Sequence, residues 1–160
     1  MEKKDLFGYL IGLVVFVIAI PAFMYKISGP VSPGRLQTVC FAVLAVPGIG
    51  LSIWSIVYMR IVGKGNPMDA FDHEIAPRTT VLMKEGPYRL CRNPMLLGIF
   101  IYYAGLLLLL CAWKALAVFV VFAVIMMRQV ASEEKRLERD FGEAYLEYKQ
   151  STKKLIPFFW

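Results

Sequence analysis

The chain has 160 residues and a formal net charge of +6, with 58% hydrophobic and 19% charged residues. This is the length of a single domain, and so apolar a composition excludes an ordinary soluble domain of this size. Long apolar runs instead indicate membrane-spanning helices. We therefore predict an all-α integral membrane protein that forms one domain over residues 1–160.

Four apolar segments follow one another along the chain. The second contains Pro47 and Gly48, where a kink is expected because a membrane helix tolerates both residue types. The apolar run after Pro94 is too long for one span, and Ala112-Trp113-Lys114 divides it into two short spans. The predicted spans are residues 6–25, 36–62, 95–111 and 113–128.

Basic residues are distributed unevenly between these segments. Thirteen of the 18 Lys and Arg residues precede the first span or lie in the loop 63–94 and the tail 129–160, and Arg60 and Arg128 lie at the span ends next to them. If the N-terminus is cytosolic, these fifteen residues are on the cytosolic side. The positive-inside rule favours this orientation, with both termini in the cytosol. Contact with anionic lipid headgroups explains the net charge, so no nucleic-acid partner is expected.

The loop 63–94 ends in polar and rigid residues that are unusual at the start of a membrane span. Residues 86–94 read Gly-Pro-Tyr-Arg-Leu-Cys-Arg-Asn-Pro. Each proline fixes its own φ and disfavours helix in the residue before it. We therefore expect a shaped loop that continues as a helix from Pro94. Arg89 and Arg92 would lie at headgroup level, as lipid anchors or as ligands for a phosphate or carboxylate.

The tail is predicted to form an amphipathic helix. Residues that recur at spacings of three and four define one face: Glu134, Leu137, Phe141, Tyr145 and Tyr148. Gly142 inside this helix costs about 1 kcal/mol relative to Ala, which indicates a close approach, a small-molecule contact or a break. Glu133 and Glu134 also suit a solvated helix start, where acidic residues complement the helix dipole.

The two polar regions resemble the paired boxes of a membrane methyltransferase family that contains isoprenylcysteine carboxyl methyltransferases and phospholipid N-methyltransferases. Residues 86–98, Gly-Pro-Tyr-Arg-Leu-Cys-Arg-Asn-Pro-Met-Leu-Leu-Gly, are similar to the first box. The second box is matched by Glu133-Glu134, Phe141-Gly142, Tyr145, Tyr148 and Pro157. The family's usual His and Tyr are replaced by Asn93 and Leu96, and Leu96 removes a hydroxyl from the pocket.

The resemblance implies a pocket for S-adenosylmethionine, with S-adenosylhomocysteine as product, between the loop and the tail helix. The implied cofactor-binding residues are His73, Thr80, Val81, Leu82, Met83, Tyr88, Asn93, Pro94, Met95, Leu96 and Glu133. The implied catalytic residues are Arg92, Arg128 and Glu134, with Arg128 as the substrate-facing arginine unless Gln129 takes that register. No metal site is expected, because His73 is the only histidine.

The implied function is methyl transfer to a lipid-like acceptor at the membrane–cytosol boundary, most like isoprenylcysteine carboxyl O-methylation. A carboxylate acceptor needs a cation to position it, whereas an amine acceptor must first lose a proton to a base. The sequence offers arginines more clearly than a base.

Two alternatives stay open. One is phosphatidylethanolamine N-methylation, with Arg89 or Arg92 on the phosphate and Glu134 or His73 assisting proton loss. The other is a non-catalytic membrane protein that binds lipid or acts as a scaffold.

Overall fold

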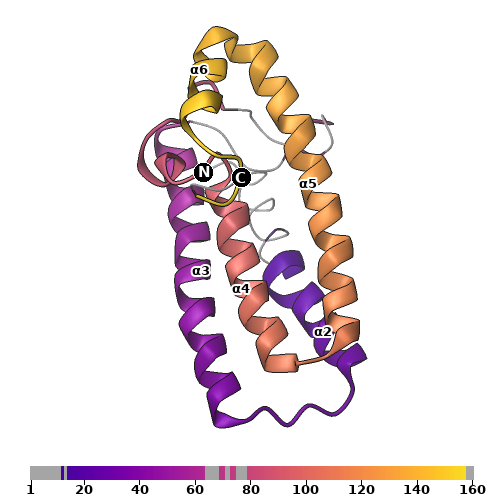
Figure 1. Cartoon of the computed structure of the whole chain (residues 1–160). Helices are drawn as coiled ribbons and strands as arrows, with labels where there is room; N and C mark the ends of the chain where they lie inside the picture. Colours follow the sequence, from indigo (N-terminus) through magenta and orange to yellow (C-terminus); the bar gives the residue numbers. More distant parts are fainter. Residues whose placement is uncertain (1–11, 13, 64–68, 71–72, 75–78, 158–160) are drawn as a thin grey trace.

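The computed structural model describes residues 12, 14–63, 69–70, 73–74 and 79–157 (Figure 1). These residues are mostly helical, as predicted. The elements are η1 (Val14–Ala19, a π-helix), α2 (Ile20–Ser28), α3 (Arg35–Ile61), η2 (Gly86–Arg89, a 3₁₀ turn), α4 (Pro94–Leu110), α5 (Trp113–Phe141) and α6 (Glu143–Ser151). One small correction to the all-α prediction is an antiparallel pair of two-residue strands, β1 (Asp69–Ala70) and β2 (His73–Glu74).

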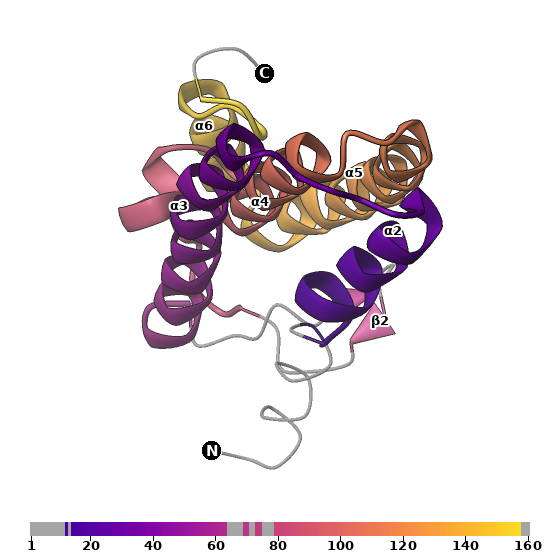
Figure 2. The same ribbon diagram turned by 90° about the horizontal axis from the view of Figure 1, so that it is seen from below.

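The long helices are arranged around α4. Helices α3 and α4 lie side by side, and α5 follows α4 through the short connection at Cys111 and Ala112 (Figure 1). Helix α2 packs on α5 and, to a smaller extent, on α4 (Figure 2). Helix α6 and the residues after it lie at the end of the bundle where α4 begins, so the box and the tail share one end (Figure 1).

Within the described residues, two helices are long and apolar enough to cross a membrane. They are α3 and α5, with 27 and 29 residues and a mean hydropathy of 2.1 in their most apolar windows. The helical stretch Val14–Ser28 and α4 are apolar but shorter. The count of four spans therefore stays a prediction, and residues 6–11 of the first predicted span lie outside the described residues.

The predicted boundary between the fourth span and the tail falls inside a helix. Helix α5 continues without interruption through residue 128 to Phe141. Its 29 residues correspond to a length of about 43 Å at a rise of about 1.5 Å per residue, which exceeds the roughly 30 Å hydrocarbon core of a bilayer. The same rigid helix therefore carries both membrane-facing and tail residues.

The interface between α3 and α4 is built from small residues. Gly48 and Ser52 of α3 meet Gly98 of α4 so closely that a Cβ on Gly98 would lie 2.4 Å from the Gly48 carbonyl oxygen. The Ser52 hydroxyl donates to the carbonyls of Gly48 (3.1 Å) and Met95 (2.9 Å). Small residues allow close backbone approach, which drives helix association in membranes. Helix α3 continues through Pro47. The close contact with α4 explains why residue 48 is a glycine.

Aromatic side chains fill the space between α4, α5 and the N-terminal helical segment. The rings of Tyr103 and Phe122 stack with centroids 5.0 Å apart and an interplanar angle of 15°. The Tyr103 hydroxyl donates to the Phe16 carbonyl at 2.9 Å, and the Tyr102 hydroxyl donates to the Val17 carbonyl at 3.3 Å. These bonds tie η1 to α4, so the short helices are held by side chains as well as by helix packing.

The α3–α4 contact predicts that Gly98→Ala destabilises the protein. The new methyl group would meet Ser52 Oγ at 2.3 Å and the Gly48 carbonyl at 2.4 Å, and overpacking of this kind costs about 1 to 3 kcal/mol. The matched control is Gly50→Ala on α3, where an added Cβ meets nothing within 4 Å. Thermal unfolding in detergent, followed by helical circular dichroism, should show a lower midpoint for Gly98→Ala only. Equal midpoints for both variants would contradict the packing.

Candidate functional site

The box begins with a turn that only glycine suits. Gly86 has a φ of +61°, and a Cβ there would lie 2.6 Å from the ring of Tyr58 on α3. Pro87 and Tyr88 are buried in the 3₁₀ turn that follows. Helix α4 then begins at Pro94, as the sequence predicts. The end of α3 therefore fixes one side of the box, and the first turn of α4 fixes the other.

Arg92 is the centre of a buried polar cluster. Its Nε and Nη2 atoms donate to Glu134 Oε1 at 2.9 and 2.7 Å. Its Nη1 atom donates to the carbonyls of Lys149, at 3.2 Å, and Thr152. The side chains of Arg92 and Glu134 are only 8% and 9% exposed. The guanidinium is thus occupied by three acceptors from two segments that lie far away in the sequence.

The same cluster holds the residues that follow α6. The Arg92 backbone N–H donates to the Lys153 carbonyl at 2.8 Å, and the Asn93 Nδ2 donates to the Lys154 carbonyl at 2.9 Å. The Lys154 ammonium lies 2.9 Å from Glu134 Oε2. Both carboxylate oxygens of Glu134 therefore have cationic partners. Hereafter we call the contacts among Arg92, Asn93, Glu134 and residues 149–154 the tail clamp.

Tyrosine and methionine side chains form a second cluster beside the tail clamp. Its buried members are Met59, Met83, Tyr88, Tyr145 and Tyr148. The Tyr148 hydroxyl donates to the Tyr88 carbonyl at 2.7 Å. The Tyr145 side chain is only 1% exposed, and its hydroxyl has no hydrogen-bond partner within the described residues. The cluster joins the ends of α3, the box, α5 and α6.

Burial keeps the tyrosine hydroxyls and the Cys91 thiol of this region neutral. It raises the pKa of Tyr88, Tyr145 and Tyr148, and the nearby carboxylate of Glu133 or Glu134 raises it further for Tyr88 and Tyr145. These hydroxyls are therefore hydrogen-bond donors rather than bases near neutral pH. Burial also raises the pKa of the Cys91 thiol to about 11, so this cysteine is not a reactive thiolate.

The structure places the predicted cofactor residues in several different surroundings. Leu82, Met83 and Tyr88 belong to the tyrosine cluster, whereas Leu96 packs against Val130 and Leu155. Thr80 and Val81 are exposed, Pro94 is buried, and Asn93 and Met95 are partly buried at the box. Glu133 is partly exposed, and its Oε1 atom lies 3.7 Å from Nη2 of Arg136. The backbone of His73 pairs with Ala70, and its side chain lies outside the described structure.

The single amphipathic tail helix predicted from the sequence is wrong. Helix α5 ends at Phe141, Gly142 has a φ of +54°, and α6 begins at Glu143. The break was one of the explanations for a glycine at this position. It turns α6 so that Tyr145 and Tyr148 face the box, and it brings the carbonyl end of α6 to Arg92.

Sequence reasoning missed the residues that complete the clamp. Lys154 lies in the second box at a position that the family pattern does not specify, and the carbonyls of residues 149–154 carry no side-chain signal. Arg136 is 5% exposed, although it falls among charged residues that suggest a solvated helix face. Its spacing of three from Glu133, a common helical ion-pair spacing, was the one available signal.

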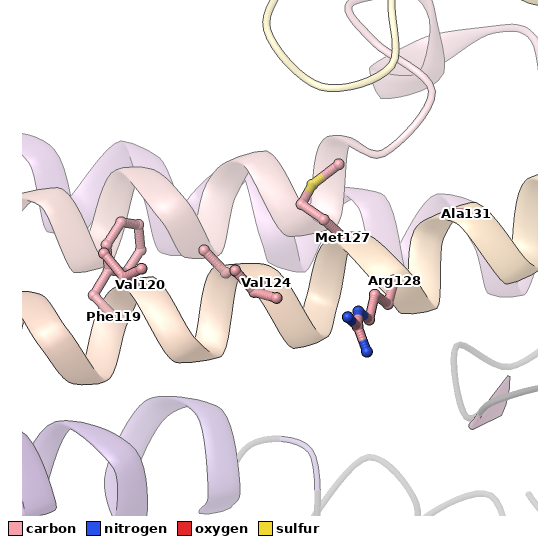
Figure 3. A pocket seen from close by; sticks show the side chains of 7 residues that line it. Phe119, Val120, Val124, Met127, Arg128 and Ala131 are labelled. Atoms are coloured by element: carbon pink, nitrogen blue, oxygen red, sulfur yellow. The ribbon is translucent and has the colours of Figure 1, made fainter.

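A shallow, open groove lies along one face of α5. It has a volume of about 430 Å³ and is lined by Phe119, Val120, Ala123, Val124, Met127, Arg128 and Ala131. Figure 3 shows these side chains along one stripe of α5, with the guanidinium of Arg128 projecting into the space beside the helix. Arg128 is exposed and supplies the charge of an otherwise apolar lining. The arrangement suits a ligand with an apolar chain and an anionic head.

Comparison with known families identifies the family to which the chain belongs. The family model described as phospholipid methyltransferase matches residues 36–144, a region that includes α3, the box, α4 and α5. The chain belongs to the phospholipid methyltransferase family. The family resemblance read from the two boxes is thus confirmed. Membership indicates a membrane-associated methyltransferase, which agrees with the two long apolar helices.

A relative with a more specific name shares part of this chain. Protein-S-isoprenylcysteine O-methyltransferase A of Arabidopsis thaliana is 36% identical over 81 residues, which cover 48% of this chain and 40% of the plant protein. The match therefore spans less than half of that relative's length.

In this member of the phospholipid methyltransferase family, the two buried tyrosines of α6 are predicted to differ in their effect on stability. Tyr148→Phe leaves the buried Tyr88 carbonyl without its donor, which costs about 1 to 3 kcal/mol. Tyr145→Phe removes a hydroxyl that has no partner within the described residues, so the free energy of unfolding should stay the same or rise. Denaturant unfolding of the two variants checks this, and a larger loss for Tyr145→Phe would contradict the hydrogen bonding described here.

Proposed function

We propose that this protein transfers a methyl group from S-adenosylmethionine to a lipid-like acceptor at the membrane–cytosol boundary. The reaction is most like isoprenylcysteine carboxyl O-methylation. Family membership supports methyl transfer, and the plant relative's name supports this acceptor class. The choice of donor and acceptor is our inference.

The observation that carries the proposal is the groove on α5, in which Arg128 is the charged lining residue. Its apolar lining suits a prenyl or acyl chain, and the guanidinium suits a carboxylate or phosphate. Arg128 and Glu133 are five residues apart on α5, which is about 7.5 Å along the helix axis. One rigid helix thus carries both the acceptor groove and the acidic pair beside the box.

The residues at the box fit a polar donor. The buried Tyr145 hydroxyl lacks a protein partner within the described residues, and it lies near the charges of Glu133, Glu134 and Arg92. A buried hydroxyl without a partner is costly, and a ligand's polar group would satisfy it. The residues proposed to hold the donor are those implied by the resemblance: His73, Thr80, Val81, Leu82, Met83, Tyr88, Asn93, Pro94, Met95, Leu96 and Glu133.

The chemistry asks little of the protein beyond alignment and exclusion of water. S-adenosylmethionine supplies a methyl group that is already activated by its sulfonium charge. Arg128 orients the acceptor carboxylate, which needs no base to act as a nucleophile. The apolar side chains of the groove keep water away from the acceptor. The acceptor chain enters laterally from the hydrocarbon side without leaving the membrane.

Phosphatidylethanolamine is the runner-up acceptor, because the matching family model is that of phospholipid methyltransferases. Its amine must lose a proton to a base before methylation. Both oxygens of Glu134 are engaged by Arg92 and Lys154, which makes this carboxylate a poor base. The buried tyrosines are also poor bases, because their pKa values are raised. These arguments favour the carboxylate acceptor.

The proposal is tested by donor binding and methyl transfer with purified protein. Calorimetry should show saturable binding of S-adenosylhomocysteine near one to one. A labelled donor should then methylate a prenylated cysteine analogue, in preference to phosphatidylethanolamine and to a water-soluble carboxylate of similar head chemistry. Absence of donor binding at millimolar concentration would contradict the enzyme. Labelling of phosphatidylethanolamine alone would select the runner-up, and labelling of the soluble acid alone would contradict lateral entry.

The same assay separates the role of Arg128 from a general effect of charge. Arg128→Ala removes a charge-assisted hydrogen bond worth about 1.5 to 3 kcal/mol, so the acceptor KM should rise about tenfold or more while donor affinity is unchanged. Lys135→Ala on the exposed side of α5 removes the same charge and should leave both quantities unchanged. Equal effects of the two substitutions would argue against a specific acceptor site at Arg128.

We also propose four spans with both termini in the cytosol. In this arrangement the α4–α5 turn lies on the opposite side of the membrane from the box. Cys111 in this turn is exposed, whereas Cys91 at the box is buried. In sealed vesicles, a membrane-impermeant maleimide should label Cys111 only from the non-cytosolic side, and Cys111→Ser should abolish that labelling. Labelling of Cys111 from the cytosolic side would reject this orientation.

A further inference from the structure

The tail clamp occupies the carbonyl end of α6. The last carbonyls of a helix have no partner within the helix and carry partial negative charge. The Arg92 guanidinium binds the Lys149 carbonyl in the last turn of α6 and the Thr152 carbonyl just after it. An arginine from a distant segment therefore acts as the C-terminal cap of α6.

The clamp also fixes the chain beyond α6. Three successive carbonyls, those of Thr152, Lys153 and Lys154, accept hydrogen bonds from Arg92 or Asn93. Leu155 then packs, 4% exposed, against Leu96 and Val130. Glu134 ties the clamp to α5, because it binds Arg92 through one oxygen and Lys154 through the other.

We propose that Arg92 and Glu134 are positioning residues that dock α6 and residues 152–155 onto the box, and that the donor site is complete only when this tail is docked. The inference rests on the proposed function for its donor part. It replaces the sequence-based expectation that the two residues act on the reactants, because the guanidinium and both carboxylate oxygens are already engaged inside the protein. Tyr145 and Tyr148 belong to α6 and lie beside the clamp. Docking of α6 would therefore place these two side chains for contact with the donor.

The experiment compares tail docking with donor binding in full-length protein. Hydrogen exchange in detergent, read by mass spectrometry, reports docking through the backbone amides of residues 143–157. Arg92→Ala should speed their exchange at least tenfold, weaken S-adenosylhomocysteine binding at least tenfold and raise the donor KM. The acceptor KM at saturating donor should stay within twofold. Arg92→Lys keeps the charge but has fewer donors, so it should restore part of both docking and donor affinity.

Two further variants keep the test decisive if Arg92→Ala folds poorly. Lys154→Ala removes one partner of Glu134 and should give smaller changes in the same direction. Arg89→Ala removes a cation of the same box that is 75% exposed and lies 3.8 Å from Glu85. This control should leave tail exchange and donor affinity unchanged.

The outcomes distinguish this inference from the proposed function. Loss of donor affinity in Arg92→Ala with normal tail protection would mean that Arg92 contacts the reactants, and it would overturn the inference. Faster tail exchange with normal donor affinity would overturn it as well. If the unaltered protein binds no donor, the proposed function fails with the donor part of the inference, whereas the exchange data still decide whether the clamp exists.

Discussion

The buried contact between Arg92 and Glu134 determines how the box and the tail are assembled at one end of the helix bundle. It joins the box before α4 to α5, 42 residues further along the chain, and through Lys154 and the α6 carbonyls it also joins the tail. Removal of one partner from a buried ion pair costs about 3 to 5 kcal/mol, because the other charge is left unpaired. The carbonyls held by Arg92 would lose their donor at the same time. The site region is thus stabilised mainly by polar contacts that cross long sequence distances.

The packing of the membrane helices sets the position of this contact. Gly48, Ser52 and Gly98 allow α3 and α4 to approach closely, so the ends of both helices meet the box in a fixed relation. Tyr58 on α3 lies against Gly86, and Pro94 begins α4 directly after the clamp residues. Helix α5 passes from the bundle to the region of the box and the tail without a break. A groove beside Arg128 and an acidic pair next to the box therefore share one rigid element.

Local sequence signals predicted much of the fold, and long-range contacts explain the rest. The apolar runs predicted α3, α4 and α5. Because a proline disfavours helix in the residue before it, the sequence also predicted correctly that α4 begins at Pro94. The end of α5 was missed because its polar residues continue the helix for three turns beyond the apolar run. The acidic pair and the box arginine were identified as important from their joint occurrence. Their mutual contact could not be predicted, because the two residues are 42 positions apart and no local pattern pairs them. The carbonyls of residues 149–154 that also bind Arg92 and Asn93 are not marked by any residue type.

The central claim is that the donor is held between the box and the docked tail. Hydrogen exchange of the unaltered protein with and without S-adenosylhomocysteine tests it most directly. The account predicts added protection in two separate segments together, residues 80–96 and residues 133–155, with little change at the α4–α5 turn around Cys111. Protection confined to one of these segments, or protection centred on the turn, would contradict it.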